Sequence, residues 1–202
     1  MVKKFNLQLY LNHLKNPDRQ KLQQQITEEI TDGDLTRYFG KKDFKNILKY
    51  SELSRYSTIQ QLLPGKKSWK IILVEDEYNS GHWICIFRNK ETITVFNSYG
   101  GFPSDEINYI SPLKNKQLGQ DKKYLNILLE DALREGFYIV YNKRELQKLE
   151  KGYNTCGKWV IFFILMFENY DMNLQGFINL VDKLKKQYKL TSDELVSLII
   201  QK

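Results

Sequence analysis

The sequence is poor in the residues that build metal centres and disulfide frameworks. Its 202 residues include two cysteines, Cys85 and Cys156, and two histidines, His13 and His82. They form no CxxC pair, and their spacing along the chain does not match that of a structural zinc site. We therefore expect no metal and no cofactor, and free thiols in a reducing compartment.

The chain also lacks a long apolar run and a secretory leader. Its most apolar stretch, residues 156–167, holds about a dozen residues and is far too short to cross a bilayer. The first four residues are followed by an amphipathic segment rather than by the apolar region of a signal peptide. No internal repeat or low-complexity tract is present, and we expect no membrane partner.

Basic residues outnumber acidic ones, 31 against 24, which gives a formal net charge of +7. Such a surplus favours contact with nucleic acid. The basic residues are scattered in pairs, however, and the densest set is Lys183, Lys185 and Lys186. Nonspecific DNA binding is therefore one hypothesis, and a lysine-rich surface without that role is the alternative.

The hydrophobic pattern predicts an α+β fold, with strands grouped in the middle of the chain and helices at both ends. The predicted strands are residues 68–75, 82–88, 92–96 and 137–141. The first three are joined by short connections, which favours an antiparallel meander. We expect one domain over residues 1–202, with a helical N-terminal lobe (1–65), a core (66–170) and C-terminal helices (171–202).

Cys156 stands at the start of the most apolar segment. From Trp159 onward this segment is apolar on every side, so a helix formed there must be buried. In the first turn of such a helix, unpaired backbone N–H groups and the helix dipole favour a thiolate. This position suits a nucleophile, and the alternative is a small buried residue.

His82 opens a predicted strand directly after Gly81. Strand alternation puts His82 and Cys85 on opposite faces, so we expect Cys85 in the core. In an antiparallel meander Asn97, at the end of the next strand, falls beside His82. There it can accept a hydrogen bond from Nδ1–H and leave Nε2 toward a thiol. Alone, Asn97 would be a turn residue, and His13 is expected to be a surface or packing residue.

Four motifs in this order resemble those of the adenovirus-protease-like (adenain/Ulp1-like) cysteine peptidases. They are Gly81-His82-Trp83, then Phe96-Asn97-Ser98-Tyr99-Gly100, then Gln147, then Asn154-Thr155-Cys156-Gly157-Lys158. The most similar subset is the capsid-maturation proteases of virophages, Polinton-like elements and large DNA viruses. The resemblance covers roughly residues 48–170.

The resemblance implies a papain-like fold, with a mostly antiparallel sheet and a buried helix that carries the cysteine at its N-terminus. It makes Cys156 the nucleophile, His82 the general base and Asn97 the occupant of the acid position. Gln147 becomes the side-chain donor of the oxyanion hole. Its alternative is an exposed loop glutamine, because it lies farther before the cysteine than in the adenoviral branch.

Asn97 departs from the family, which usually has Asp or Glu at this position. An amide can orient the ring of His82, but it cannot stabilise an imidazolium by charge. A cysteine enzyme tolerates this better than a serine enzyme, because the thiolate itself can offset the positive charge.

The implied activity is cleavage of viral capsid and structural precursor proteins after small, glycine-type residues, in the virion or the viral factory. Trp83 and Gly81 would line the substrate channel, with a core aromatic as the alternative for Trp83. DNA or a peptide is a possible activator. Two rivals remain: an isopeptidase for SUMO or ubiquitin-like conjugates, and a non-enzymatic DNA-binding capsid scaffold protein.

Overall fold

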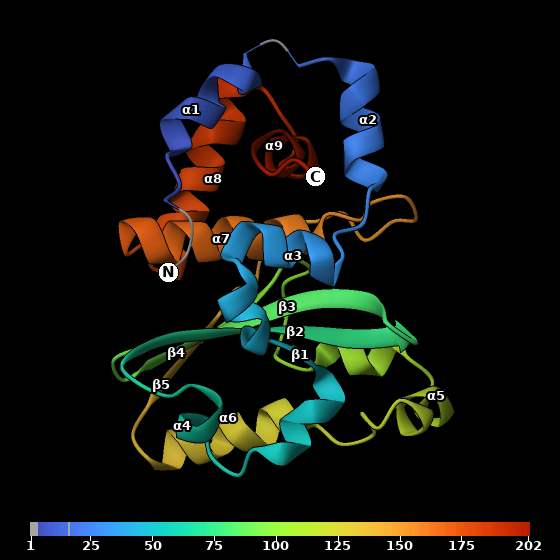
Figure 1. The fold of residues 1–202 in the computed structure, drawn as a ribbon, viewed down its shortest axis with the longest axis vertical. Helices are drawn as coiled ribbons and strands as arrows, with labels where there is room; N and C mark the ends of the chain where they lie inside the picture. The colour runs from blue at the N-terminus through green and yellow to red at the C-terminus, as the bar shows by residue number, and fades with distance from the viewer. Residues whose placement is uncertain (1–3, 16) are drawn as a thin grey trace. The chain divides into compact units, whose positions relative to one another are not determined.

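The computed structural model describes residues 4–15 and 17–202 (Figure 1). The chain forms two compact units: unit 1 contains residues 1–44 and 145–202, and unit 2 contains residues 45–144. The described strands all belong to unit 2, and the fold class is α+β, as predicted. The units divide after residues 44 and 144 rather than at the predicted lobe boundaries, 65 and 170, because residues 47–49 pair with the sheet and the C-terminal helices contact the N-terminal ones.

Unit 2 is built on a five-stranded sheet with the strand order β1-β2-β3-β4-β5. The strands are β1 (Ile47–Lys49), β2 (Lys67–Glu77), β3 (Ser80–Asn89), β4 (Thr92–Asn97) and β5 (Tyr138–Tyr141). The three central strands form the predicted antiparallel meander. The short outer strands pair in parallel, β1 with β2 and β5 with β4.

β1 lies within the N-terminal lobe, residues 1–65, that the sequence predicts to be helical. Three residues are too few to show a hydrophobic period, so pattern alone cannot distinguish a strand from a helix there. The segment is extended because it pairs with the edge of β2, with Ile47 opposite Ile71 and Lys49 opposite Leu73.

One face of the sheet packs against helices of the same unit. These are η3 (Tyr50–Arg55), α4 (Ile59–Leu62), η4 (Asp105–Tyr109) and α6 (Tyr124–Arg134). α5 (Pro112–Gln117) belongs to the same unit. Ile84 and Ile86 of β3 share a buried cluster with Leu125 and Leu128 of α6. Figure 1 shows α4 and α6 on the same side of the sheet. Since His82 shares a face with Ile84, its side chain belongs to this covered face.

The regular secondary structure among the described residues of unit 1 is helical. Its helices are α1 (Leu7–Leu11), η1 (Asn12–Leu14), α2 (Arg19–Thr27), α3 (Asp32–Phe39), α7 (Cys156–Tyr170), α8 (Leu174–Tyr188) and α9 (Ser192–Ile199), and η2 (Lys41–Asn46) runs across the boundary with unit 2. α9 begins at a T-x-x-E capping box, in which Thr191 and Glu194 bond each other's backbone N–H groups.

α7 is the buried helix that the apolar run predicts. Every residue from Gly157 to Phe167 is buried. Three of its aromatic rings contact Phe177 of α8, at centroid distances of 6.2 Å for Trp159, 5.1 Å for Phe162 and 4.8 Å for Phe163. These contacts fix α7 within unit 1, and with it the position of its first residue, Cys156.

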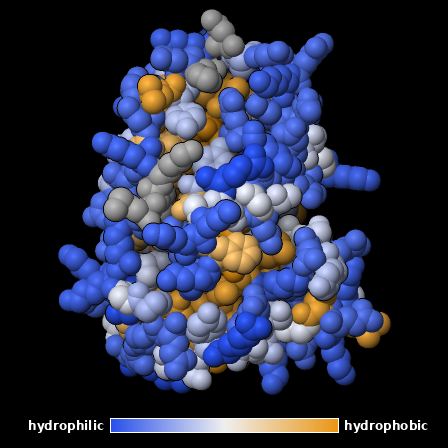
Figure 2. Space-filling model, in the orientation of Figure 1, coloured by the Kyte–Doolittle hydropathy of each residue, from blue (hydrophilic) through white to orange (hydrophobic). Residues whose placement is uncertain are grey.

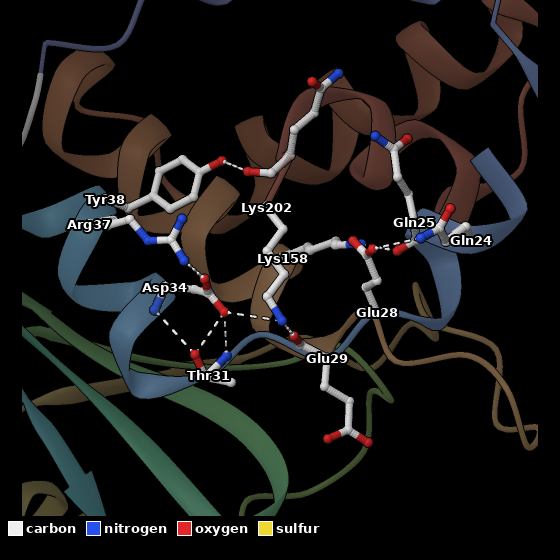
Figure 3. A network of polar contacts seen from close by, with 11 residues as sticks. Gln24, Gln25, Glu28, Glu29, Thr31, Asp34, Arg37, Tyr38, Lys158 and Lys202 are labelled. Atoms are coloured by element: carbon white, nitrogen blue, oxygen red, sulfur yellow. Dashed lines mark hydrogen bonds and ion pairs between the residues drawn. The ribbon is translucent and has the colours of Figure 1, made fainter. Parts of the chain in front are cut away.

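The C-terminal end of the chain is tied to α3 by polar contacts (Figure 3). The Lys202 ammonium donates to Glu29 O at 3.0 Å and lies 3.5 Å from a carboxylate oxygen of Asp34. The Tyr38 hydroxyl donates to Gln201 O at 2.5 Å. These bonds place the last residues in the same unit as the N-terminal helices.

Hydrophilic side chains cover most of the face drawn in Figure 2, with separate apolar areas between them. No helix in the described part of the chain is long and apolar enough to cross a membrane. Among the same residues, no group of three or more His, Cys, Asp or Glu is placed to hold a metal ion.

Gly157 tests how tightly the start of α7 is packed. A Cβ atom there would lie 2.5 Å from the Cβ of Ile30, which is buried. We expect Gly157→Ala to lower the free energy of unfolding by about 1–3 kcal/mol through overpacking. The matched control is Gly33→Ala in α3, where the nearest atom is 3.7 Å away, and alanine should be neutral or stabilising by less than about 1 kcal/mol. Chemical denaturation measures both, and equal effects would contradict the packing.

Candidate active site

The side chains of His82 and Asn97 meet in unit 2, as the meander predicts. Ile84 of β3 is paired with Asn97 of β4, and His82 lies two residues before Ile84 on the same face. His82 Nε2 is 2.7 Å from Asn97 Oδ1. The ring therefore faces Asn97 with Nε2, whereas the sequence-based expectation gave this contact to Nδ1. Strand pairing predicts neighbours but does not fix the side-chain torsions that decide which nitrogen points where.

Four hydrogen bonds fix the orientation of the Asn97 amide. Its Oδ1 accepts from the Tyr99 backbone N–H at 3.0 Å as well as from His82. Its Nδ2 donates to Gly100 O at 3.1 Å and to Glu106 Oε1. Because a backbone N–H can only donate and a backbone carbonyl can only accept, the amide cannot be reversed.

The orientation of Asn97 determines the proton on His82. Oδ1 is an acceptor, so Nε2 carries the hydrogen and Nδ1 holds the free lone pair of the neutral ring. Nδ1 is buried and has no hydrogen-bond partner among the described residues. The atom available as a base is therefore Nδ1.

Burial keeps His82 neutral. It lowers the pKa of the imidazole to about 4, and the hydrogen bond that the ring donates to Asn97 opposes this only in part. The ring of Tyr99 stacks on it, with centroids 3.9 Å apart and planes within 10°. At neutral pH the ring is thus a fixed, unprotonated base, and any proton that it takes must be stabilised by a neighbouring negative charge.

Glu106 is a functional candidate that the sequence did not indicate. It lies in η4, nine residues after Asn97, and its side chain is buried with 4% exposed. Burial raises the pKa of its carboxyl to about 7. No sequence signal marks it, because it follows a Gly- and Pro-containing loop whose path only the folded chain defines. We call His82, Asn97, Tyr99 and Glu106 the imidazole cluster.

Asn142 holds the backbone of Asn97. Its Oδ1 accepts from Asn97 N at 2.8 Å, and its Nδ2 donates to Asn97 O at 2.5 Å. Asn142 directly follows β5, which is parallel to β4, so this amide continues the ladder beyond the last paired residues. The end of β4 is therefore held on its backbone as well as through its side chain.

Gly81 is required by the close approach of β2 and β3. It has a φ of +154°, and a Cβ there would lie 2.0 Å from Val74 O. Trp83 is buried on the face of β3 opposite to His82, which accords with the core-aromatic alternative. The predicted substrate contacts of Gly81 and Trp83 stay predictions. Cys85 is fully buried, as expected, and burial raises the pKa of its thiol well above the usual value.

In unit 1, Cys156 is the first residue of α7, is half-buried and forms no disulfide. The loop before it is anchored on two sides. Asn154 donates from its backbone N–H to Ile26 O at 3.0 Å and from its side chain to Thr27 O at 2.8 Å. The Thr155 hydroxyl donates to Asp193 Oδ1 at 2.5 Å. Hydrogen bonds therefore fix the backbone that leads into Cys156.

Asp193 connects the two ends of the loop that precedes Cys156. Its second oxygen accepts from the backbone N–H of Lys148, the residue after Gln147, at 3.1 Å. One buried carboxylate thus fixes the residues adjacent to both Gln147 and Cys156. No local sequence signal indicates this contact, because Asp193 lies 38 positions after Thr155. We call Gln147, Thr155, Cys156 and Asp193 the thiol cluster.

Gln147 is buried, with 1% of its surface exposed, so the exposed-loop alternative is wrong. Its Nε2 donates to Tyr153 O at 2.7 Å, which sets the plane of the amide. Its role as an oxyanion donor is not tested by these contacts. The side chain of His13 lies outside the part of the chain that the structure describes.

Lys158 is a buried cation two residues after the thiol. Its ammonium donates to Gln25 O of α2 (Figure 3), and 1% of the residue is exposed. Burial lowers the pKa of this amine to about 8, although the charges of Glu28, Asp193 and Cys156 act in the opposite direction. Lys158 therefore joins the first turn of α7 to α2 and brings positive charge to that turn.

Comparison with known proteins relates the chain to viral sequences. No family model matches it. It is 35% identical to the uncharacterized protein V9 of Sputnik virophage over 155 residues, which cover 76% of this chain and 84% of V9.

Solved structures with a similar course of the backbone are proteases. The ASFV pS273R protease is 12% identical, with a TM-score of 0.44 over 87% of this chain and 69% of that one. The SUMO protease Ulp1 with its catalytic cysteine oxidized to a sulfenic acid is 17% identical, with a TM-score of 0.41 over 99% and 96%. The Ulp1 protease domain in complex with Smt3, the yeast ortholog of SUMO, is 14% identical, with a TM-score of 0.38 over 99% and 96%.

Asp193→Ala should destabilise the protein by about 1–3 kcal/mol, because it leaves the buried Thr155 hydroxyl and the Lys148 N–H without their acceptor. Asp32→Ala is the control. Asp32 is an exposed acidic residue in the first turn of α3, and its loss removes only a helix-dipole contribution of about 0.3–1 kcal/mol. Urea denaturation compares the two variants, and a cost at Asp193 no larger than that at Asp32 would show that the loop is held by other contacts.

Glu106 should make stability depend on pH. Its pKa is raised from 4.5 to about 7 on folding, so between these values the unfolded chain releases a proton that the folded chain keeps. Its contribution to stability therefore falls as pH rises through this window. Glu106→Gln lacks this loss. Its free energy of unfolding relative to the wild type should increase by about 1–3 kcal/mol from pH 4.5 to 7, measured in urea. A difference that stays constant over the range would contradict it.

Proposed function

This chain belongs to the family of the uncharacterized protein V9 of Sputnik virophage, and we propose that it is a viral cysteine endopeptidase that cleaves capsid or other structural precursor proteins. The observation that carries the proposal is the bond between His82 Nε2 and Asn97 Oδ1 at 2.7 Å, which leaves Nδ1 as the basic atom of a buried ring. The thiol at the start of α7 supplies the nucleophile that such a base requires.

The proposed reaction is acyl transfer to Cys156 followed by hydrolysis. Nδ1 of His82 takes the proton of the Cys156 thiol, and the thiolate attacks the carbonyl carbon of the scissile peptide bond. The imidazolium then gives its proton to the departing amine, which leaves a thioester. A water molecule, deprotonated by the same nitrogen, attacks the thioester and releases the acid and the free thiol. Asn97 accepts from Nε2–H throughout and keeps the ring in place.

The negative oxygen of each tetrahedral intermediate needs donors. We assign this role to the backbone N–H of Cys156 and the side-chain amide of Gln147, each worth roughly 3 kcal/mol in such sites. The N-terminus of α7 favours the first, because its leading N–H groups have no partner within the helix. The bond from Gln147 to Tyr153 O and the Asp193 contact beside it favour the second, since both hold that segment rigidly.

The resemblance of the motifs to capsid-maturation proteases supports this substrate class, and the virophage relative supports a viral origin. Cleavage after glycine-type residues is the specificity that we propose, with Gly81 and Trp83 near the site of entry. An isopeptidase for ubiquitin-like conjugates would use the same residues. Incubation with such conjugates and with capsid precursors, with and without DNA, separates these substrates and tests DNA as an activator.

Co-expression with candidate capsid precursors tests the activity. We expect shortened products with the wild type and none with Cys156→Ala, because removal of the nucleophile typically lowers turnover by more than about 10³-fold. Cys85→Ala is the matched control, since it removes the other thiol and should keep cleavage. Products that persist in Cys156→Ala, assayed by mass spectrometry, would remove Cys156 from the reaction.

If no cleavage is seen, thiol labelling shows whether the substrate was unsuitable or the protein lacks a reactive thiol. Cys156 should react with iodoacetamide near pH 6, where an ordinary thiol is almost fully protonated, and His82→Gln should slow it. Cys85 should stay unlabelled until the protein is unfolded. A Cys156 that is inert in the folded protein would instead favour a non-enzymatic scaffold protein.

A further inference from the structure

A continuous hydrogen-bonded chain runs from His82 through Asn97 to Glu106. His82 Nε2–H donates to Asn97 Oδ1, and Asn97 Nδ2–H donates to Glu106 Oε1. All three side chains are buried. Because both bonds run in the same direction, negative charge on Glu106 polarises the Asn97 amide and makes its oxygen a stronger acceptor for His82.

Glu106 supplies the negative charge that Asn97 lacks. Asn97 is neutral and can orient the imidazole, but it cannot offset a positive charge on it. Glu106 is an acidic side chain one hydrogen bond further along. Its other oxygen, Oε2, is buried without a partner among the described residues. Burying a carboxyl in this way is costly, and a glutamine would serve equally well if only an acceptor for Asn97 were needed.

We propose that Glu106 is a positioning residue that acts on His82 through Asn97: its ionised carboxylate holds the Asn97 amide and stabilises the positive charge that His82 acquires when it takes a proton. The consequence for catalysis rests on the proposed peptidase function. The effect on the His82 ring does not, and it can be measured by itself.

Among the described residues of unit 2, other ionisable side chains also lie near His82 and Glu106. Asp105, the neighbour of Glu106 in η4, accepts from Phe102 N at 2.8 Å and acts on Glu106 by its charge. Tyr50 of η3 bonds Ser104 Oγ at 3.0 Å, and burial raises its pKa to about 12, so it stays neutral. Tyr99 stacks on the imidazole. Asp105 is therefore the charge against which the contribution of Glu106 must be compared.

The first experiment follows the His82 ring by ¹⁵N NMR in a Cys156→Ser background, with His13→Gln to assign the two rings. The wild-type ring should show the Nε2–H tautomer and a second titration step near pH 7, where Glu106 ionises. Glu106→Gln should lose that step, whereas Asp105→Asn, which removes a neighbouring charge without contact to Asn97, should keep it. The proposal is overturned if the wild type has no such step, or if it persists in Glu106→Gln.

The second experiment measures the rate of Cys156 labelling against pH. In the wild type the labelling rate should rise by about tenfold as Glu106 ionises. The negative charge acts through Asn97 and should raise the pKa of His82 by about one unit. Glu106→Gln should lack this rise and Asp105→Asn should keep it. If His82→Gln leaves labelling unchanged, the peptidase proposal fails. If His82→Gln slows labelling but Glu106→Gln follows the wild-type profile, the role of Glu106 fails alone.

Discussion

The chemistry of unit 2 depends on one side-chain amide whose hydrogen-bonding capacity is fully used. Asn97 accepts twice and donates twice, and its backbone is held by Asn142. A fully bonded buried amide has a single orientation. That orientation sets the tautomer of His82 and leaves Nδ1 as its basic nitrogen. An asparagine is therefore a specific solution here, because an aspartate could not donate to Gly100 O.

At each end of this network lies a polar atom that has no hydrogen-bond partner among the described residues. Nδ1 of His82 and Oε2 of Glu106 are buried and unbonded among the described residues. Leaving such atoms unpaired costs stability, commonly about 1–3 kcal/mol each. Burial also shifts the two groups in opposite directions, lowering the pKa of the imidazole and raising that of the carboxyl. Both shifts disfavour charge in the resting molecule, so proton transfer into this site needs the two groups to act together.

In unit 1, a buried polar side chain likewise holds the residues next to the thiol. Asp193 binds Thr155 and Lys148, residues adjacent to Cys156 and Gln147, and so it fixes a loop that has no regular secondary structure. α7 is the buried helix at which this loop ends. The C-terminal segment is therefore part of the thiol cluster's support. Its helices looked unrelated to any motif, yet one of them carries the residue that joins both ends of the loop.

The sequence by itself determined the elements whose signals are local. The apolar run predicts α7 with Cys156 at its start, and strand alternation predicts that His82 meets Asn97 while Cys85 is buried. Tertiary structure alone decided that Nε2 faces Asn97, that Glu106 lies behind it and that Asp193 supports the thiol. Thr155 and Asp193 are 38 positions apart, and no periodicity encodes a contact at that separation. Such contacts exist only because buried polar groups must find partners once the chain has folded.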